Sequence, residues 1–243
     1  MTDTNNLSSN SKKILNEIRK EILFNRNYKH ATEIISDFPA PDNYCFKDTL
    51  GMLYFQTREY EKAKVVYKNL NMHYQEGFCE LLCGNEQRAA EIWNTCPDSP
   101  AVQWGLCVLD FIKLKVSHLP TFLQVRNFLE HDLERFLQAN RLEYAENLVN
   151  CCEILADINL EAYKFIGRAL YNNGYRELAA EHFTLSRDAI PNDPEVHYYL
   201  AQCNYLNDKY DDAVKCLNRC LELNTNYTPA RVMLDKISKK APC

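Results

Sequence analysis

Residues 163–191 read YKFIGRALYNNGYRELAAEHFTLSRDAIP, and this stretch decides the fold. Apolar side chains recur in it at intervals of three and four residues, which is the spacing of an α-helix that buries one face. Gly174 lies between two such runs, in a tight turn, and Pro191 follows the second run, where a helix has to stop. The stretch therefore predicts two antiparallel helices joined by a short turn.

The same helical spacing extends over most of the 243 residues. Nine prolines are placed so that long proline-free runs lie between them, and no run alternates polar and apolar residues as an exposed strand would. The chain has only 6 glycines, which is few for a fold rich in β-turns or for a glycine-rich phosphate loop. We therefore predict an all-α fold.

The helix pairs repeat along the chain. A tight turn followed by an alanine that begins a second helix occurs six times, at Ala31, Ala63, Ala89, Ala145, Ala179 and Ala213. The last two intervals between these alanines are both 34 residues, whereas the earlier ones are 32, 26 and 56 residues. A period of 34 residues is typical of one class of helical repeat.

This pattern resembles the tetratricopeptide repeat family, whose signature combines a Leu-Gly pair on the first helix with an alanine and an aromatic residue on the second. Three segments carry it: Leu50-Gly51 with Ala63 and Tyr67, Ile166-Gly167 with Ala179 and Phe183, and Leu200-Ala201 with Ala213 and Leu217. Small residues are needed where two helices cross closely. The resemblance implies an α-solenoid of antiparallel helix pairs that winds as a right-handed superhelix.

The spacing also predicts the domain organisation. We expect a flexible polar N-terminus over residues 1–11, a first repeat block over 12–97, an irregular helical connector over 98–125, and a second block over 126–238. The short interval of 26 residues predicts a shortened first helix around Tyr74–Cys83. The last stripe, Ala230 to Ile237, predicts a capping helix that turns Asp235, Lys236, Lys239 and Lys240 to solvent.

Composition and charge narrow the class of protein. The net charge is −5, which argues against a nucleic-acid or membrane partner. The most apolar stretch, 101–116, is interrupted by charges, and the first 13 residues lack the apolar core of a signal peptide. We therefore expect a cytoplasmic protein whose 11 cysteines stay reduced.

The cysteines offer two interpretations. Cys79 and Cys83, like Cys216 and Cys220, are four residues apart and would share a helix face, so a metal- or redox-responsive protein, or an enzyme that uses the cysteine and histidine set, is one hypothesis. Cys-x-x-Cys knuckles are absent from the sequence, however, and cysteines recur in the small-residue position seven residues after the marker alanines. Those positions are Cys96, Cys152, Ser186 and Cys220. We favour packing, and we expect no metal, no cofactor and no catalysis, because no catalytic motif is present.

The resemblance implies a concave groove lined by the first helices, which would bind a peptide or protein segment. Ten positions are expected to face this groove: Met52, Phe55, Glu130, Glu134, Lys164, Arg168, Tyr171, Tyr198, Gln202 and Tyr205. Lys164 and Arg168 would pair with carboxylates of the partner, and the tyrosines would provide broad contacts. An ordinary solvated surface and a second copy of the chain remain alternatives, and the sequence does not name the partner.

Overall fold

The structure is a computed structural model that describes residues 9–37 and 44–239. Within those residues every regular element is a helix and no strand occurs, so the predicted all-α class is confirmed. No helix in the described part is both long and apolar enough to cross a bilayer. The cytoplasmic location stays a prediction.

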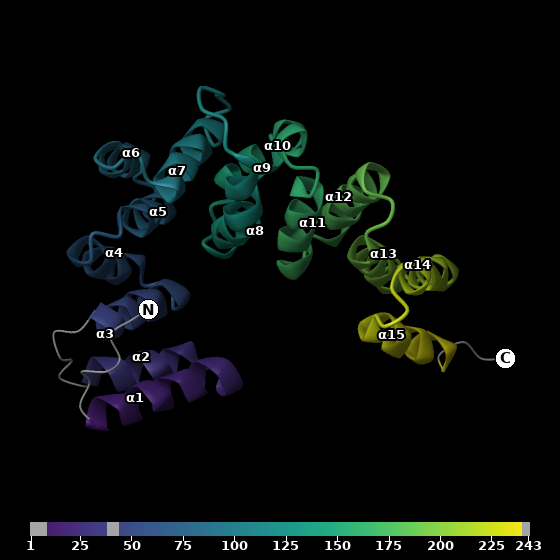
Figure 1. The fold of residues 1–243 in the computed structure, drawn as a ribbon, viewed down its shortest axis with the longest axis horizontal. Helices are drawn as coiled ribbons and strands as arrows, with labels where there is room; N and C mark the ends of the chain where they lie inside the picture. Colours follow the sequence, from purple (N-terminus) through teal and green to yellow (C-terminus); the bar gives the residue numbers. More distant parts are fainter. Residues whose placement is uncertain (1–8, 38–43, 240–243) are drawn as a thin grey trace. The chain divides into compact units, whose positions relative to one another are not determined.

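The chain divides into two compact units, and the boundary follows Leu109, inside a helix. The first unit contains the helices α1 (Ser9–Lys20), η1 (Glu21–Asn25, a π-helix), α2 (Tyr28–Asp37), α3 (Tyr44–Gln56), α4 (Tyr60–Asn69), α5 (His73–Cys83), α6 (Glu86–Asn94) and most of α7 (Pro100–Phe111) (Figure 1).

The second unit follows with eight further helices in the described residues, which are coloured teal to yellow in Figure 1. They are α8 (Phe122–Gln138), α9 (Leu142–Asn150), α10 (Cys152–Ile158), α11 (Ala162–Asn172), α12 (Arg176–Ala189), α13 (Pro194–Leu206), α14 (Tyr210–Leu223) and α15 (Thr228–Ser238). Of the segment 1–11 that was predicted to be flexible, residues 1–8 lie outside the described residues. The remaining residues, 9–11, belong to α1, which begins at Ser9. The predicted block limits stay predictions.

The turns within the helix pairs share one backbone geometry. Five residues before each of the six marker alanines, the chain adopts a left-handed conformation, with φ between 49° and 89°. These residues are Arg26, Arg58, Gly84, Asn140, Gly174 and Asp208. In five of the six turns the next backbone N–H bonds to a carbonyl five residues earlier, as Tyr175 N does to Leu170 O at 3.0 Å. This is the hydrogen-bonding pattern of a Schellman helix end.

The marker alanines lie at the helix crossings. All six are at most 2% exposed, and each is the fourth residue of its helix, so the second helices begin three residues earlier than the alanines. Gly51 and Gly167 lie opposite the aromatic rings of the partner helix: a Cβ atom at Gly51 would be 2.8 Å from Tyr67, and one at Gly167 would be 2.7 Å from Phe183. Only glycine lets these helices approach so closely.

The prediction of a shortened first helix around Tyr74–Cys83 is wrong. Helix α5 has 11 residues, the same number as α11. The second helices are the short ones: α4 has 10 residues and α6 has 9, whereas α12 has 14. The short interval arises because α4 ends early and α5 follows it after three residues, Leu70–Met72.

The predicted irregular region contains α7 and a loop, and no second helix pairs with α7 before α8 begins. The next pair is irregular as well. Its second helix breaks at Cys151, which ends α9 and precedes α10. The sequence analysis did not anticipate α10, because the apolar stripe runs through the break without a glycine or a proline.

Candidate functional site

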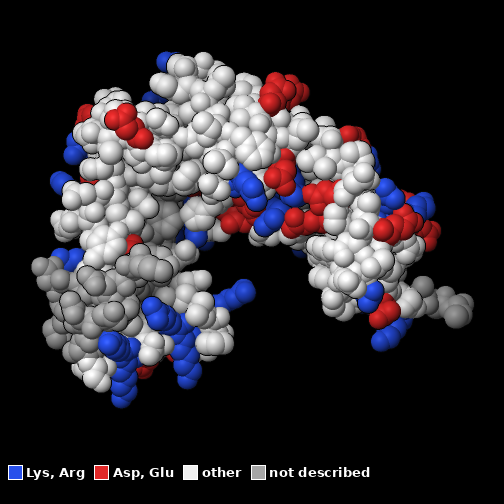
Figure 2. Space-filling view, in the orientation of Figure 1, with Lys and Arg blue, Asp and Glu red and all other residues white. Residues whose placement is uncertain are grey.

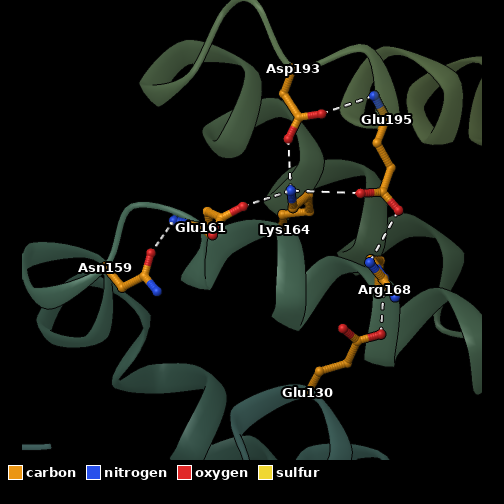
Figure 3. Close-up of polar contacts among 7 residues, drawn as sticks. All are labelled: Glu130, Asn159, Glu161, Lys164, Arg168, Asp193 and Glu195. Carbon is orange, nitrogen blue, oxygen red and sulfur yellow. Dashed lines mark hydrogen bonds and ion pairs between the residues drawn. The ribbon is translucent and has the colours of Figure 1, made fainter. Parts of the chain in front are cut away.

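A buried lysine lies at the centre of an ionic network in the second unit (Figure 3). Lys164 projects from α11 and is only 7% exposed. Its Nζ atom is 2.8 Å from Asp193 Oδ2, 3.0 Å from Glu161 Oε1 and 3.6 Å from Glu195 Oε2. Asp193 also caps α13, because its Oδ1 atom accepts a hydrogen bond from Glu195 N at 2.9 Å.

Arg168, one turn further along α11, extends the network to two other helices. Its Nε atom is 2.9 Å from Glu130 Oε1 on α8, and its Nη1 atom is 3.1 Å from Glu195 Oε1 on α13. Asn172 Nδ2 donates to Glu134 Oε1 at 2.8 Å. The first helices of three consecutive pairs are therefore joined by polar contacts. Figure 2 shows the blue and red side chains gathered over this part of the second unit.

The charges of the network hold both cations in their ionised forms. Burial acts to lower the pKa of Lys164, but the hydrogen bonds to Asp193 and Glu161 outweigh it and raise the pKa above its usual value. Burial also acts to lower the pKa of Arg168, but the charges of Glu130 and Glu195 outweigh it. The pKa of Arg168 is therefore raised. Glu130 behaves differently, because its own burial raises its pKa despite the nearby Arg168.

Four of the residues predicted to line the groove make contacts within the chain itself. Lys164, Arg168, Glu130 and Glu134 do come together in space, but they are occupied by one another and by carboxylates and amides of the same chain. Their predicted pairing with a partner's carboxylates stays untested. In the free protein the network joins helices.

The remaining predicted residues of the second unit line a separate pocket of about 570 Å³. Tyr171 lies on α11, and Tyr198, Gln202 and Tyr205 lie on α13, all of which contribute to its wall. The opposite wall belongs to the capping helix α15 and was not predicted. The lining residues that the sequence analysis missed are Leu206, Thr228, Pro229, Val232, Met233 and Lys236.

The pocket combines aromatic walls with a few polar groups. Gln202 Nε2 donates to the Tyr198 hydroxyl at 3.1 Å, and Lys236 Nζ lies 5.0 Å from the centre of the Tyr205 ring, within range of a cation–π interaction. Burial raises the pKa of both Tyr171 and Tyr198, so their hydroxyls stay protonated at neutral pH. Lys236 is exposed, as predicted for the capping helix, but it also lies beside Tyr205 of α13, which the sequence did not indicate.

Two of the predicted groove residues belong to the first unit and are more enclosed than expected. Phe55 is 8% exposed and contacts the rings of Tyr60 and Phe78, with centroid separations of 5.6 and 6.2 Å. Met52 is partly buried and packs against the core formed around Ile18 and Leu53. Phe55 therefore acts as a core residue and leaves little surface for a partner.

The cysteines contribute to the packing of the helices. Ten cysteines lie in the described residues; five are buried, five are partly buried, and none of the ten forms a disulfide. Burial raises the pKa of Cys79, and burial together with a hydrogen bond to Glu61 raises that of Cys83 to about 11. Cys220 and Ser186, in the recurring small-residue position, are fully buried. Within residues 9–37 and 44–239, no group of three or more His, Cys, Asp or Glu side chains is placed so that it could hold a metal ion.

Burial of the thiols predicts a loss of stability in alkali. The pKa values of Cys203 and Cys220 are raised by burial from 9.0 to about 11. Between these limits the unfolded chain loses protons that the folded chain keeps, so the free energy of unfolding falls by on the order of 1 kcal/mol per pH unit for each thiol. Urea denaturation at pH 8 to 11 with a reductant would measure the slope, and we expect Cys220→Ala to remove the share of one thiol from it. A pH-independent stability would contradict the prediction.

The comparison with known families decides the identity of one segment. Residues 194–227, which comprise α13, α14 and the turn that follows, match the model of the tetratricopeptide repeat. The chain therefore contains a tetratricopeptide repeat over residues 194–227. The matched repeat contains Leu200, Ala201, Ala213 and Leu217, which carry the resemblance in the sequence, and the resemblance is confirmed.

Solved tetratricopeptide repeat structures align along most of the chain at low identity. MamA from Desulfovibrio magneticus RS-1 is 12% identical, with 90% of this chain and 98% of that chain covered and a TM-score of 0.36. YrrB, described as having an unusual peptide-binding site, is 13% identical, with coverages of 86% and 97% and a TM-score of 0.37. The TPR2AB domain of yeast Sti1, in a complex with pHSP90, is 12% identical, with coverages of 95% and 96% and a TM-score of 0.37. No curated protein matches the sequence significantly.

Some of the missed residues left a signal in the sequence. Asp193-Pro194 is a helix N-cap followed by a proline in the first turn, which places a carboxylate at the start of α13. Val232 and Lys236 are four residues apart and share a face of α15. That this face closes a pocket with α13 depends on the angle of the capping helix, which sequence spacing does not define.

Proposed function

We propose that this protein is a non-catalytic interaction module that binds a segment of another protein in the pocket between α13 and α15. Tetratricopeptide repeats stack into extended concave surfaces that are used for binding. The observation that carries the proposal is the pocket of about 570 Å³, in which Tyr171, Tyr198 and Tyr205 face the apolar side of α15.

The chemistry of the pocket indicates what it would bind. Tyrosines offer broad contact area and lose little conformational entropy on binding. Lys236 and Gln202 add one cation and one amide at the wall. An extended segment with an apolar or aromatic side chain, followed by a hydrogen-bonding or acidic group, fits these walls. The ionic network around Lys164 supports the site indirectly, because it holds α11 and α13 together.

Photo-crosslinking tests the location of the site. We expect a photo-reactive amino acid at Val232, which is 62% exposed and lines the pocket, to form an adduct with a cellular protein. The matched control is the same group at Val65 on α4, which is 57% exposed and far along the chain in the first unit. Adducts at both positions, or at neither, would argue against the pocket as the binding site.

The same pair of positions tests the energetics. Once the crosslinked protein is identified, Val232→Asp should weaken its binding at least about tenfold, because a carboxylate at an apolar wall leaves a desolvated charge. Val65→Asp should leave the affinity unchanged. Isothermal titration of both variants measures the difference. An adduct consisting of two copies of this chain would assign the pocket to self-association.

The hypothesis of a metal- or redox-responsive protein has little support from the described cysteines. Their pKa values are raised where a shift is resolved, as for Cys79 and Cys203, and thiolate formation is therefore disfavoured at neutral pH. In the described residues we find no nucleophile and base placed together in a way that favours catalysis.

A further inference from the structure

The connection between α7 and α8 exposes a concentration of apolar side chains. Among the described residues sixteen large hydrophobic side chains are exposed, and five of them lie within the ten residues 114–123. They are Leu114, Val116, Leu119, Phe122 and Leu123, between 48% and 64% exposed. Such a patch marks an interaction site more often than a chance cluster does.

The backbone of this connection is held in place by polar contacts on its inner side. Asp110 Oδ2 accepts hydrogen bonds from the backbone N–H groups of Ser117, at 3.1 Å, and His118, at 2.9 Å. Asn147 Nδ2 donates to Ile112 O at 2.8 Å, which ties the loop to α9. Thr121 and Gln124 form a capping box at the start of α8. The apolar side chains thus point outward from a fixed scaffold.

The Lys, Arg, Asp and Glu residues within the stretch 111–129 are all basic, and the carboxylate of Asp110, just before it, is bound to the backbone of the loop. No aspartate or glutamate occurs from residue 111 to residue 129, although the chain has 33 acidic residues in all. Lys113, Lys115 and Arg126 lie in this stretch and are exposed, and Arg126 lies one helical turn after Phe122. Figure 2 shows a white surface with blue at its edge where Figure 1 shows this loop, between α7 and α8.

We propose that residues 112–126, which we name the connector loop, dock on the surface of an anionic lipid bilayer. The apolar side chains would enter the headgroup region, and the lysines and the arginine would lie among the lipid phosphates. Peripheral binding of this kind needs both an apolar and a cationic contribution, and the connector loop presents both. The net charge of −5, from which the sequence analysis predicted no membrane partner, is an average that does not describe this segment.

The form of the connector loop favours a lipid surface over a protein groove as the occupant. Its apolar side chains lie on a connection between helices, and they do not line the pocket between α13 and α15. A protein partner would have to supply a cleft with an acidic rim. A bilayer supplies an apolar interior and a continuous negative surface without any matched shape.

Vesicle co-sedimentation of the full chain tests the proposal. We expect the protein to sediment with phosphatidylcholine vesicles that contain phosphatidylglycerol, and less with vesicles of phosphatidylcholine alone. Leu119→Ser combined with Phe122→Ser should lower the partition coefficient on the anionic vesicles at least about tenfold, because two apolar side chains no longer enter the interface. Lys115→Gln should lower it roughly fivefold on anionic vesicles and leave it unchanged on neutral ones.

The matched control replaces exposed apolar residues elsewhere. Val65→Ser combined with Leu185→Ser, on α4 and α12, removes comparable exposed apolar surface and should leave vesicle binding unchanged. Circular dichroism melting curves of all variants check that the fold persists. Absence of sedimentation with anionic vesicles, or equal losses in the two double variants, overturns the proposal. Sedimentation velocity that shows oligomers lost only in the Leu119→Ser, Phe122→Ser variant would assign the loop to contacts between copies of the chain and would equally overturn it.

Discussion

Gly77→Ala is expected to destabilise the first unit by about 3 kcal/mol, although alanine is the better helix former. A Cβ atom at Gly77 on α5 would lie 2.3 Å from Nε1 and 2.5 Å from Cε2 of Trp93 on α6. Such distances require the indole ring to move. The clash therefore outweighs the gain of about 1 kcal/mol that alanine brings to a helix interior.

Trp93 has no room to move away. Its other side faces Gly105 on α7, where a Cβ atom would be 2.9 Å from the ring. The ring is fully buried, stacks on Tyr74 with centroids 6.1 Å apart, and donates from Nε1 to His73 O at 3.1 Å. Displacing it would break this hydrogen bond and leave a buried donor unsatisfied.

Chemical denaturation with a double-mutant cycle measures the effect. Gly77→Ala, Trp93→Leu and the double variant form the cycle, and we expect Gly77→Ala to cost much less when residue 93 is leucine. Gly105→Ala, which meets the same ring at a greater distance, should cost less than Gly77→Ala. Stabilisation by Gly77→Ala in the wild-type background would show that the ring adapts and that the crossing is looser than the structure indicates.

Lys164→Met is expected to destabilise the second unit by about 3 kcal/mol. The substitution keeps the length and packing of the side chain but leaves Asp193 and Glu161 without their cation, while Glu195 keeps only Arg168. Removing one partner of a buried ion pair lowers the free energy of unfolding by more than the pair contributed, because the remaining charges stay desolvated.

Urea denaturation of the wild type and the variants tests this expectation. Adding Asp193→Asn should restore part of the stability lost in Lys164→Met, since it removes one uncompensated charge and keeps an oxygen to cap α13. Lys215→Met is the control, because Lys215 pairs with Asp212 at 2.9 Å on the solvent side of α14 and its loss should change little. If Lys164→Met and Lys215→Met lowered the free energy of unfolding equally, the ion pairs of Lys164 would be no more stabilising than an exposed pair.

The candidate site could be predicted only in part. Residue spacing indicated that Tyr198 and Tyr205 share a face of α13, because positions seven apart lie on one side of a helix, and both line the pocket together with Tyr171 of α11. The same spacing did not show that Lys164 is occupied by Asp193, which is 29 residues away. It also did not show that Phe55 is enclosed by Tyr60 and Phe78.

A pattern that was present in the sequence explains one wrong prediction. Gly77, Ala89 and Trp93 have the same spacing as Gly167, Ala179 and Phe183, so α5 and α6 form an ordinary pair. The interval between the alanines alone does not show which helix of the repeat is the shorter one. The glycine-to-alanine interval, which spans the turn, would have placed the deletion in α4.

The sequence by itself determined the helical class, the second helices that contain Ala31 to Ala213, and the close crossings at Gly51 and Gly167. These follow from local chemistry: helix periodicity, left-handed turns and the space that a missing Cβ atom leaves. Only the tertiary structure decided which charged residues satisfy one another, which face of α15 closes the tyrosine pocket, and that the connector loop turns its apolar side chains outward. Those features depend on the angles at which helices pack, and such angles arise from many contacts between residues distant in the chain.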